Sequence, residues 1–246
     1  MVVKIAAIIE ARMASSRLPG KVLLPVLNLP MLGRLIMRLK SIEFLDQIIV
    51  ATTNNLDDAL IVATAAKYGA EIYRGSENDV LGRVLEAAKQ YNIDLIVEIT
   101  GDCPIIDPTI VVSTIQHYFD SKADYVSNSN IRSYPDGMDV QVYRTNVLEY
   151  SSSLANLPLE REHVTLHIRQ NPTLFKILDI HAPKEFFFPN LGLTLDTSED
   201  LDFLKNIIEN LEPKKFLFSL KDTLEYLDNN SDLLRINNHV IRKGDS

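Results

Sequence analysis

Cations and hydroxyl groups collect in one short segment near the start of the chain. Residues 10–21 read EARMASSRLPGK, which places Arg12, Arg17 and Lys21 close to Ser15 and Ser16. Three cations with two hydroxyl groups can surround the phosphates of a nucleotide. On this segment alone, an exposed loop that happens to carry Arg and Lys fits equally well. A phosphate-binding role therefore needs support from elsewhere in the chain.

The end of this segment differs from the common nucleotide-binding loops. Pro19 presets φ and Gly20 permits a positive φ, so the pair predicts a type II turn that aims Lys21 back over the loop. Ser15 stands where a Walker A loop has its first Gly, Val22 stands where it has the metal-binding hydroxyl, and no GxGxxG pattern is present. The segment therefore argues against a P-loop ATPase and a Rossmann dehydrogenase.

Two aspartates follow apolar runs that are far apart in the sequence. Asp102 comes after residues 95–99 in a Gly-Asp-Cys-Pro turn, and Asp196 comes after residues 193–195, which we expect to form a strand. If both strand ends share one edge of the sheet, the two carboxylates can converge on one Mg²⁺ ion, which favours hard oxygen ligands. The alternatives are a turn-forming role for Asp102 and a helix-capping role for Asp196.

Short β-rich runs alternate with stretches of helical spacing. The runs cover residues 3–9, 47–52, 95–99 and 124–127, and the pattern predicts a mostly parallel sheet covered on both faces. The best helical period covers residues 79–91, with Asp79 as the N-cap. We expect a second helix to begin at Ser198, which we predict to be its cap.

The second half of the chain has a less regular pattern. Residues 134–137 read as a turn and residues 139–143 as a strand, within a region, 128–190, that we predict to face the substrate or form a dimer contact. We expect one domain over residues 1–228 and a polar tail over residues 229–246, which lacks an obvious core face.

Composition sets limits on the class of protein. The chain has 246 residues, 46% of them hydrophobic, and a net charge of −8, which fits one α/β domain and argues against a general nucleic-acid surface. Its single cysteine, Cys103, cannot form an intrachain disulfide. The apolar start is too short to span a bilayer and lacks a signal-peptide cleavage site, so we predict no membrane insertion and a cytoplasmic location.

Six segments in this order resemble the SpsF-type cytidylyltransferases of spore coat polysaccharide biosynthesis, which are related to the CMP-ketodeoxyoctonate and CMP-acylneuraminate synthetases. The resemblance extends from about residue 3 to residue 204. The segments that carry it are residues 11–22, 74–81, 99–104, 134–137, 161–165 and 195–200.

The resemblance implies a three-layer α/β fold of the GT-A-like nucleotide-diphospho-sugar transferase type, with CTP as donor, Mg²⁺ as cofactor and a homodimer. By position, it implies catalytic roles for Arg12, Lys21 and Asp102, and metal ligation by Asp102 and Asp196. Arg74, Gly75 and Ser76 match the base and ribose pocket, although a tight loop before the next helix fits Arg74 equally well. The full set of implied nucleotide contacts is Ala11, Arg12, Met13, Ser15, Ser16, Lys21, Arg74, Gly75, Ser76 and Asp102.

The acceptor side is predicted from two further segments. Arg161 can meet a sugar carboxylate with two hydrogen bonds, and His163 can orient or deprotonate a hydroxyl group. A surface ion pair and a structural histidine are slightly better readings of the same two residues. The candidate acceptor residues are Tyr134, Asp136, Asp139, Arg161 and His163.

The chain departs from the family pattern at three positions. Ala14 stands where the family usually has Gly, Gly192 where many members have Arg, and Gln141 where Glu is frequent. These departures bear more on the acceptor contacts than on the metal site.

The predicted reaction is in-line attack by an acceptor oxygen on the α-phosphorus of CTP. It would transfer CMP to an acidic sugar of the 2-keto-3-deoxy or nonulosonic type, for surface polysaccharide or glycan biosynthesis, and release pyrophosphate. A phosphate- or phosphonate-bearing acceptor, which would give a CDP-type product, and a catalytically silent nucleotide-binding subunit are the alternatives. A metal-dependent glycosyltransferase is disfavoured, because Asp102 is followed by Cys103-Pro104 and not by an Asp-x-Asp motif.

Overall fold

The computed structural model describes residues 3–242. Within that range a seven-stranded sheet has the order β5-β4-β1-β6-β8-β7-β9. Neighbouring strands are parallel except where β8 pairs with β6 and β7. The predicted three-layer α/β fold with a mostly parallel sheet is confirmed. The strands of the sheet are β1 (Ile5–Glu10), β4 (Gln47–Thr53), β5 (Glu71–Gly75), β6 (Leu95–Thr100), β7 (Tyr125–Ser127), β8 (Gln141–Arg144) and β9 (Ile177–Asp179), and a small hairpin adds β2 (Pro25–Val26) and β3 (Leu29–Pro30).

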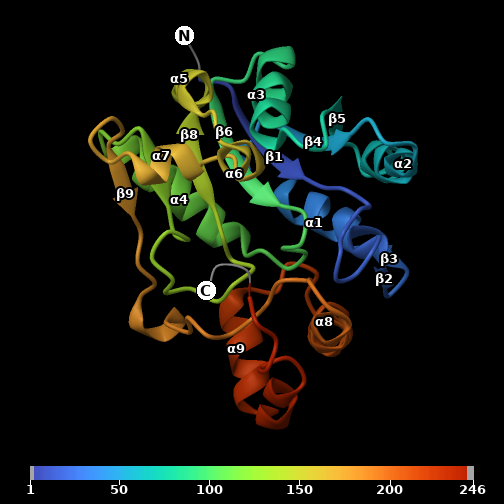
Figure 1. Cartoon of the computed structure of the whole chain (residues 1–246). Coiled ribbons are helices and arrows are strands. Elements are labelled where there is room, and N and C mark those ends of the chain that lie inside the picture. Colours follow the sequence, from blue (N-terminus) through green and yellow to red (C-terminus); the bar gives the residue numbers. More distant parts are fainter. Residues whose placement is uncertain (1–2, 243–246) are drawn as a thin grey trace.

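Helices cover both faces of the sheet (Figure 1). Successive side chains of a strand point to opposite faces, and β1 shows this clearly. Ala7 and Ile9 belong to a core shared with α1, α4 and α8, whereas Ala6 and Ile8 belong to a second core shared with α3, α5 and α7. The helices are α1 (Met31–Leu39), α2 (Ala59–Lys67), α3 (Val80–Gln90), α4 (Pro108–Asp120), α5 (Thr145–Leu154), α6 (Pro158–Glu162), α7 (Leu166–Gln170), α8 (Ser198–Leu211) and α9 (Leu220–Asp228), with 3₁₀ turns η1 (Lys21–Leu23), η2 (Leu56–Asp58), η3 (Lys184–Phe186) and η4 (Ser231–Arg235).

Of the two predicted helix caps, one is correct and one is off by a residue. Asp79 caps α3 and accepts a hydrogen bond from Gly82 N at 2.8 Å. Ser198 is the first residue of α8, and Thr197 is its cap. Thr197 and Asp200 have the three-residue spacing of a capping box, in which each side chain accepts from the other's backbone N–H. Asp200, three positions after Thr197, is the sequence signal that identifies Thr197 as the cap.

Residues 193–195 do not form the expected strand. They cross the end of the sheet with a bend at Thr194, and Leu193 N donates to Asp136 O at 2.7 Å while Leu195 N donates to Asp102 O at 2.8 Å. Gly137 has φ +100°, and a Cβ there would lie 2.5 Å from the Leu193 backbone. Because Gly137 lacks a side chain, residues 193–195 can pass close to it and reach Asp102 without joining the sheet.

The last described residues pack against the rest of the chain. After α9 the chain forms η4, and Asn237 is then buried, with 4% of its surface exposed. None of the helices in residues 3–242 combines the length and the apolar character needed to cross a membrane.

Candidate active site

A hollow of about 420 Å³ opens where strands β1 and β6 end. This is the edge of a parallel sheet at which ligands usually bind, and the volume is in the range of small-molecule sites. Ten of the predicted site residues line it. Its full lining consists of Glu10, Ala11, Arg12, Ser15, Ser16, Arg17, Lys21, Val22, Val80, Arg83, Thr100, Gly101, Asp102, Arg132, Asp136, Asp139, Glu162, His163, Thr194 and Asp196.

Lys21 joins the two aspartates that the sequence suggested as a pair. Its Nζ donates to Asp102 Oδ2 and to Asp196 Oδ1, each at 2.8 Å. Arg17 contacts the other oxygen of Asp196, also at 2.8 Å. The two carboxylates, 94 positions apart in the sequence, therefore meet at one point in the hollow.

The electrostatics of this cluster depend on the ion pairs. Burial alone would lower the pKa of Lys21, but the carboxylates of Asp102 and Asp196 outweigh it and raise that pKa. Burial would likewise raise the pKa of Asp102, but the Lys21 ammonium outweighs it and the pKa falls. The Asp102 carboxyl group therefore favours its ionised form although it is shielded from water, as a cation-binding site requires.

The chemistry of this donor set fits a divalent cation. Two carboxylates already hold one positive charge between them, the Lys21 ammonium. Magnesium commonly uses one or two carboxylates and completes its shell with water and phosphate oxygens. In residues 3–242 no cluster of three or more His, Cys, Asp or Glu side chains is suited to a metal ion. Asp102 and Asp196 could provide two carboxylate ligands to such an ion.

Asp58, at the start of α2, holds the loop of residues 10–21 in place through hydrogen bonds. Asp58 is buried, and its Oδ1 accepts from Met13 N at 2.8 Å while Oδ2 accepts from both Thr52 and Thr53. Gly20 has φ +68°, as the Pro-Gly pair predicted, and its N–H donates to Met13 O at 3.0 Å. Met13 therefore shapes the loop through its backbone and does not line the hollow.

The predicted base and ribose segment lies outside the hollow. Arg74 donates to Thr53 O at 2.9 Å and to Asn55 O at 2.7 Å, which ties it to the end of β4. Ser76 Oγ accepts from Asp79 N at 3.2 Å. Neither these two residues nor Gly75 is part of the lining. Arg74 and Gly75 are the last residues of strand β5, and the loop before α3 begins at Ser76, so the tight loop that the sequence allowed as the alternative does not include Arg74.

The acceptor candidates separate into two groups. Asp136, Asp139 and His163 line the hollow, whereas Tyr134 is buried in the core. Arg161 also lies elsewhere: its Nη2 donates to Asp79 Oδ2 at 2.5 Å and its Nη1 to Ser152 Oγ at 2.9 Å. Arg161 therefore makes the ion pair that the sequence allowed as the alternative, and it does not line the hollow.

Comparison with known proteins decides the family. A cytidylyltransferase family model matches residues 6–230, which includes every residue of the hollow. The chain belongs to the cytidylyltransferase family. The predicted enzyme class and the resemblance are both confirmed.

This cytidylyltransferase is similar to three proteins over most of its length. It is 34% identical to the spore coat polysaccharide biosynthesis protein SpsF of Bacillus subtilis, over 92% of this chain and 94% of that protein. It is 29% identical to an 8-amino-3,8-dideoxy-manno-octulosonate cytidylyltransferase of a Shewanella species, over 89% and 91% of the two chains. The solved structure of a cytidylyltransferase from Leptospira borgpetersenii covers 98% of this chain and 100% of its own, with a TM-score of 0.90 at 35% identity.

The departures from the family pattern have different structural consequences in this cytidylyltransferase. Among the described residues Ala14 is not one of those with positive φ, so the loop forms without a glycine there. Gln141 lies below the hollow, where it donates to Glu98 Oε1 at 2.8 Å and accepts from Tyr125 and Thr165 at 2.6 Å. Neither change alters the groups that face the hollow.

Two titratable residues of the cytidylyltransferase, Glu10, which is partly buried, and Arg83, which is buried, were missed from the sequence. Glu10 ends β1, and burial raises its pKa well above the usual value, with the neighbouring Glu98 carboxyl adding to the rise. Arg83 lies on the inner side of α3 and is 3% exposed. Among the described residues, Glu10 Oε1 and Arg83 Nε have no hydrogen-bond partner. A charged residue between Val80 and Val84, on the apolar face of a helix, was the available signal for Arg83.

Arg132, which the sequence analysis did not select, also lines the hollow. Its Nη1 donates to Asp139 Oδ1 at 2.6 Å, and its Nη2 lies 3.6 Å from Asp136. No periodicity or motif singles out Arg132, because it lies in an irregular segment between β7 and β8.

Replacing Arg132 and replacing Arg161 should have different effects on kinetics and stability. Arg132→Ala should raise the KM for the acceptor about tenfold, because a guanidinium is lost from the wall of the hollow. Arg161→Ala should leave kcat/KM within about twofold and lower the free energy of unfolding by about 0.5 kcal/mol, since its ion pair is partly exposed. Steady-state pyrophosphate release and urea denaturation of both variants test this. A larger kinetic effect of Arg161→Ala would return that residue to the acceptor side.

Proposed function

We propose that this cytidylyltransferase transfers CMP from CTP to an acidic sugar of the 2-keto-3-deoxy or nonulosonic type and releases pyrophosphate. The observation that carries the proposal is the convergence of Asp102 and Asp196 on Lys21, in a hollow that Arg12 and Arg17 also line. The names of the relatives support the product class, since one is a cytidylyltransferase for an amino-dideoxy octulosonate and another acts in polysaccharide biosynthesis.

The loop residues would bind the nucleotide. Arg12, Arg17 and Lys21 provide positive charge for the phosphates, and the Ser15 and Ser16 hydroxyl groups line the same wall. Asp102 and Asp196 would hold Mg²⁺, which when bound supplies charge neutralisation at the phosphates and orientation of the leaving group. The Lys21 ammonium has three N–H donors, and after the two that bind Asp102 and Asp196 one remains for a phosphate oxygen.

The reaction requires one bond to form and one to break. The acceptor hydroxyl oxygen attacks the α-phosphorus, the bond from that phosphorus to the bridging oxygen breaks, and pyrophosphate leaves with the electron pair. The hydroxyl proton passes to a base on the acceptor wall. Burial raises the pKa of Asp139 to about 7, with Arg132 opposing and Asp136 adding to the rise, so this carboxyl group is matched to proton transfer near neutral pH. His163 is on the same wall and would orient the hydroxyl.

A pyrophosphate-release assay tests the proposal directly. Each of the four nucleoside triphosphates would be combined with Mg²⁺ and a panel of acidic sugars, sugar phosphates and phosphonates. We expect release only with CTP and an acidic sugar, with a CMP-sugar as the product. Release with a phosphate-bearing acceptor alone would replace the proposed acceptor with the CDP-type alternative. CTP binding without release across the whole panel would refute catalysis by this chain.

We also propose a homodimer that acts in the cytoplasm. Large apolar side chains are exposed in the region of residues 128–190, including Ile131, Leu157 and Leu159. A second copy is the partner that the family resemblance suggests for such a surface. Light scattering after gel filtration should give twice the 27.8 kDa protomer mass.

A further inference from the structure

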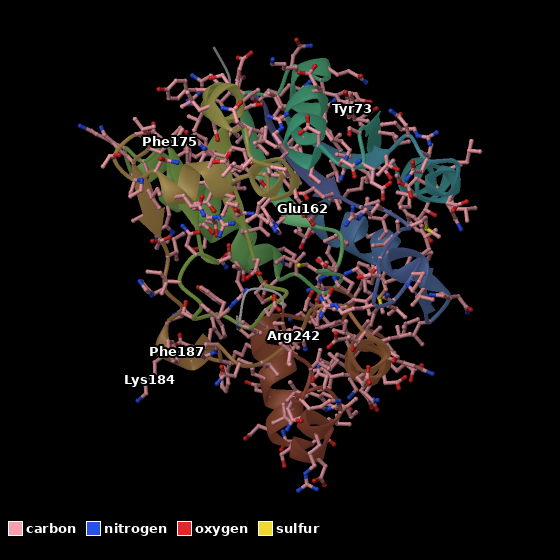
Figure 2. All side chains as sticks on the ribbon, in the orientation of Figure 1. Tyr73, Glu162, Phe175, Lys184, Phe187 and Arg242 are labelled. Carbon is pink, nitrogen blue, oxygen red and sulfur yellow. The ribbon has the colours of Figure 1, made fainter. Side chains whose placement is uncertain are left out.

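The segment after η4 returns to the active site and contacts Asp200. Arg242, labelled near helices α8 and α9 in Figure 2, donates from Nη1 to Asp200 Oδ2 at 2.9 Å and from Nη2 to Oδ1 at 2.8 Å. Asn237 Nδ2 donates to Asp200 Oδ1 at 2.9 Å and to Gly192 O at 3.0 Å. The two-bond pairing with a guanidinium fixes the orientation of the carboxylate as well as its charge.

Asp200 in turn holds the backbone that carries Asp196. Asp200 is 0% exposed, and its Oδ2 accepts from the N–H groups of Asp196 and Thr197, each at 3.0 Å. Burial would raise the pKa of Asp200, but the hydrogen bonds from Arg242 and Asn237 outweigh it and the pKa is lowered. A buried carboxylate that loses its cation is costly, so Asp200 depends on Arg242 for its charged state.

A second route leads from the same segment to Asp196. Arg17 Nη1 donates to Ile241 O at 3.2 Å, and Arg17 Nη2 contacts Asp196 Oδ2 at 2.8 Å. The residues around 241 and 242 therefore reach Asp196 both through its backbone and through a partner of its side chain.

Gly192 leaves space for the Arg242 guanidinium. A Cβ at position 192 would lie 1.9 Å from Arg242 Nη2 and 2.4 Å from Cζ, and the three nearest atoms all belong to Arg242. Gly192 is not among the glycines with positive φ, so alanine suits its backbone. Gly192→Ala would therefore displace the guanidinium without removing it.

We propose that residues 237–242 form a clamp in which Arg242 acts through Asp200 as a positioning residue for the carboxylate of Asp196. The proposal rests on the proposed function, because it assigns Asp196 to the metal. Asp200 holds the backbone of Asp196, and the two hydrogen bonds from Arg242 fix the orientation of the Asp200 carboxylate. The clamp also contacts the acceptor wall, since Arg242 Nε lies 3.9 Å from Asp136 Oδ2.

Two different variants test the clamp by the same readout. Mn²⁺ would be used as the probe, and its binding in the presence of CTP followed by electron paramagnetic resonance. We expect Arg242→Ala and Gly192→Ala each to weaken Mn²⁺ binding about tenfold, in the range found when groups that orient metal ligands are removed. The double variant should bind Mn²⁺ no more weakly than either single variant, because both changes remove the same contact. The Mg²⁺ concentration for half-maximal pyrophosphate release should rise to match.

Arg235→Ala is the matched control, because Arg235 ends η4 just before the clamp and pairs with Asp232 on the surface. Unchanged Mn²⁺ binding in both single variants, with an active wild type, would overturn the clamp and leave the proposed function in place, even if their thermal stability falls. A wild type that neither binds Mn²⁺ nor releases pyrophosphate would overturn both. If Arg242→Ala does not fold, Gly192→Ala decides the question, since it retains the guanidinium.

Discussion

Asp102→Asn should reduce CTP-dependent pyrophosphate release about 10³-fold, with the chain still folded. The substitution changes no atom positions to first order and removes one negative charge from the pair that holds Lys21. A neutral amide oxygen binds a divalent cation weakly, so both metal affinity and charge neutralisation at the phosphates are lost. The measurement is kcat/KM for CTP at several Mg²⁺ concentrations.

The fold should survive because Asp102 contributes to it through its backbone. Its carbonyl oxygen accepts from Leu195 N at 2.8 Å and from Thr194 Oγ1 at 3.2 Å, and the substitution leaves both bonds in place. Lys21 keeps its contact with Asp196. Asp202→Asn, at an exposed position on α8, is the matched control and should have wild-type kinetics. Turnover within tenfold of wild type for Asp102→Asn would remove Asp102 from the metal site.

The sequence was most informative where one residue type has one physical consequence. Gly20 was expected at positive φ because it follows Pro19, and it has φ +68°. Strands β1, β4 and β6 were predicted within about two residues, since buried parallel strands read as continuous apolar runs, whereas the less buried edge strand β5 was not predicted. The pairing of Asp102 with Asp196 followed from placing the end of β6 at the ligand-binding edge of a parallel sheet.

Asp196 lies close to Asp102, as predicted, but the strand from which this was inferred is not formed. Residues 193–195 are apolar and short, which predicts a strand, but they bond instead to the backbone of Asp102 and Asp136 as the chain crosses the sheet edge. A run of three apolar residues cannot distinguish these two cases, because both bury the same side chains.

Contacts between distant segments were beyond the reach of sequence patterns. The sequence selected Arg161 as the cation for an acceptor carboxylate and did not select Arg132, yet Arg161 pairs with Asp79 outside the hollow and Arg132 lines it. Arg242 lies in a polar segment without periodicity, and its role depends on Gly192, 50 positions earlier. In the sequence, Gly192 is only a departure from the family pattern. The structure shows that the Arg242 guanidinium occupies the space that a side chain at position 192 would fill.

Lys21→Met should have two effects of opposite sign. Turnover should fall about 10³-fold, because the phosphates lose the cation at the centre of the hollow. Binding of Mn²⁺ without nucleotide should become about tenfold tighter, because the ammonium that occupies both carboxylates is removed. Methionine keeps the apolar stem of a side chain that is 12% exposed, so the packing around η1 is retained. Electron paramagnetic resonance of the apoprotein and the pyrophosphate assay measure the two effects separately.

The sign of the change in metal binding separates two roles for Lys21. In Asp102→Asn both turnover and Mn²⁺ binding should fall, since a ligand is lost, whereas in Lys21→Met they should move apart, since a competitor is lost. If Lys21→Met instead weakens Mn²⁺ binding, the ammonium is needed to keep the mutually repelling carboxylates of Asp102 and Asp196 ionised and together. Lys21 would then organise the metal site, and Arg12 and Arg17 would be left as the cations for the phosphates.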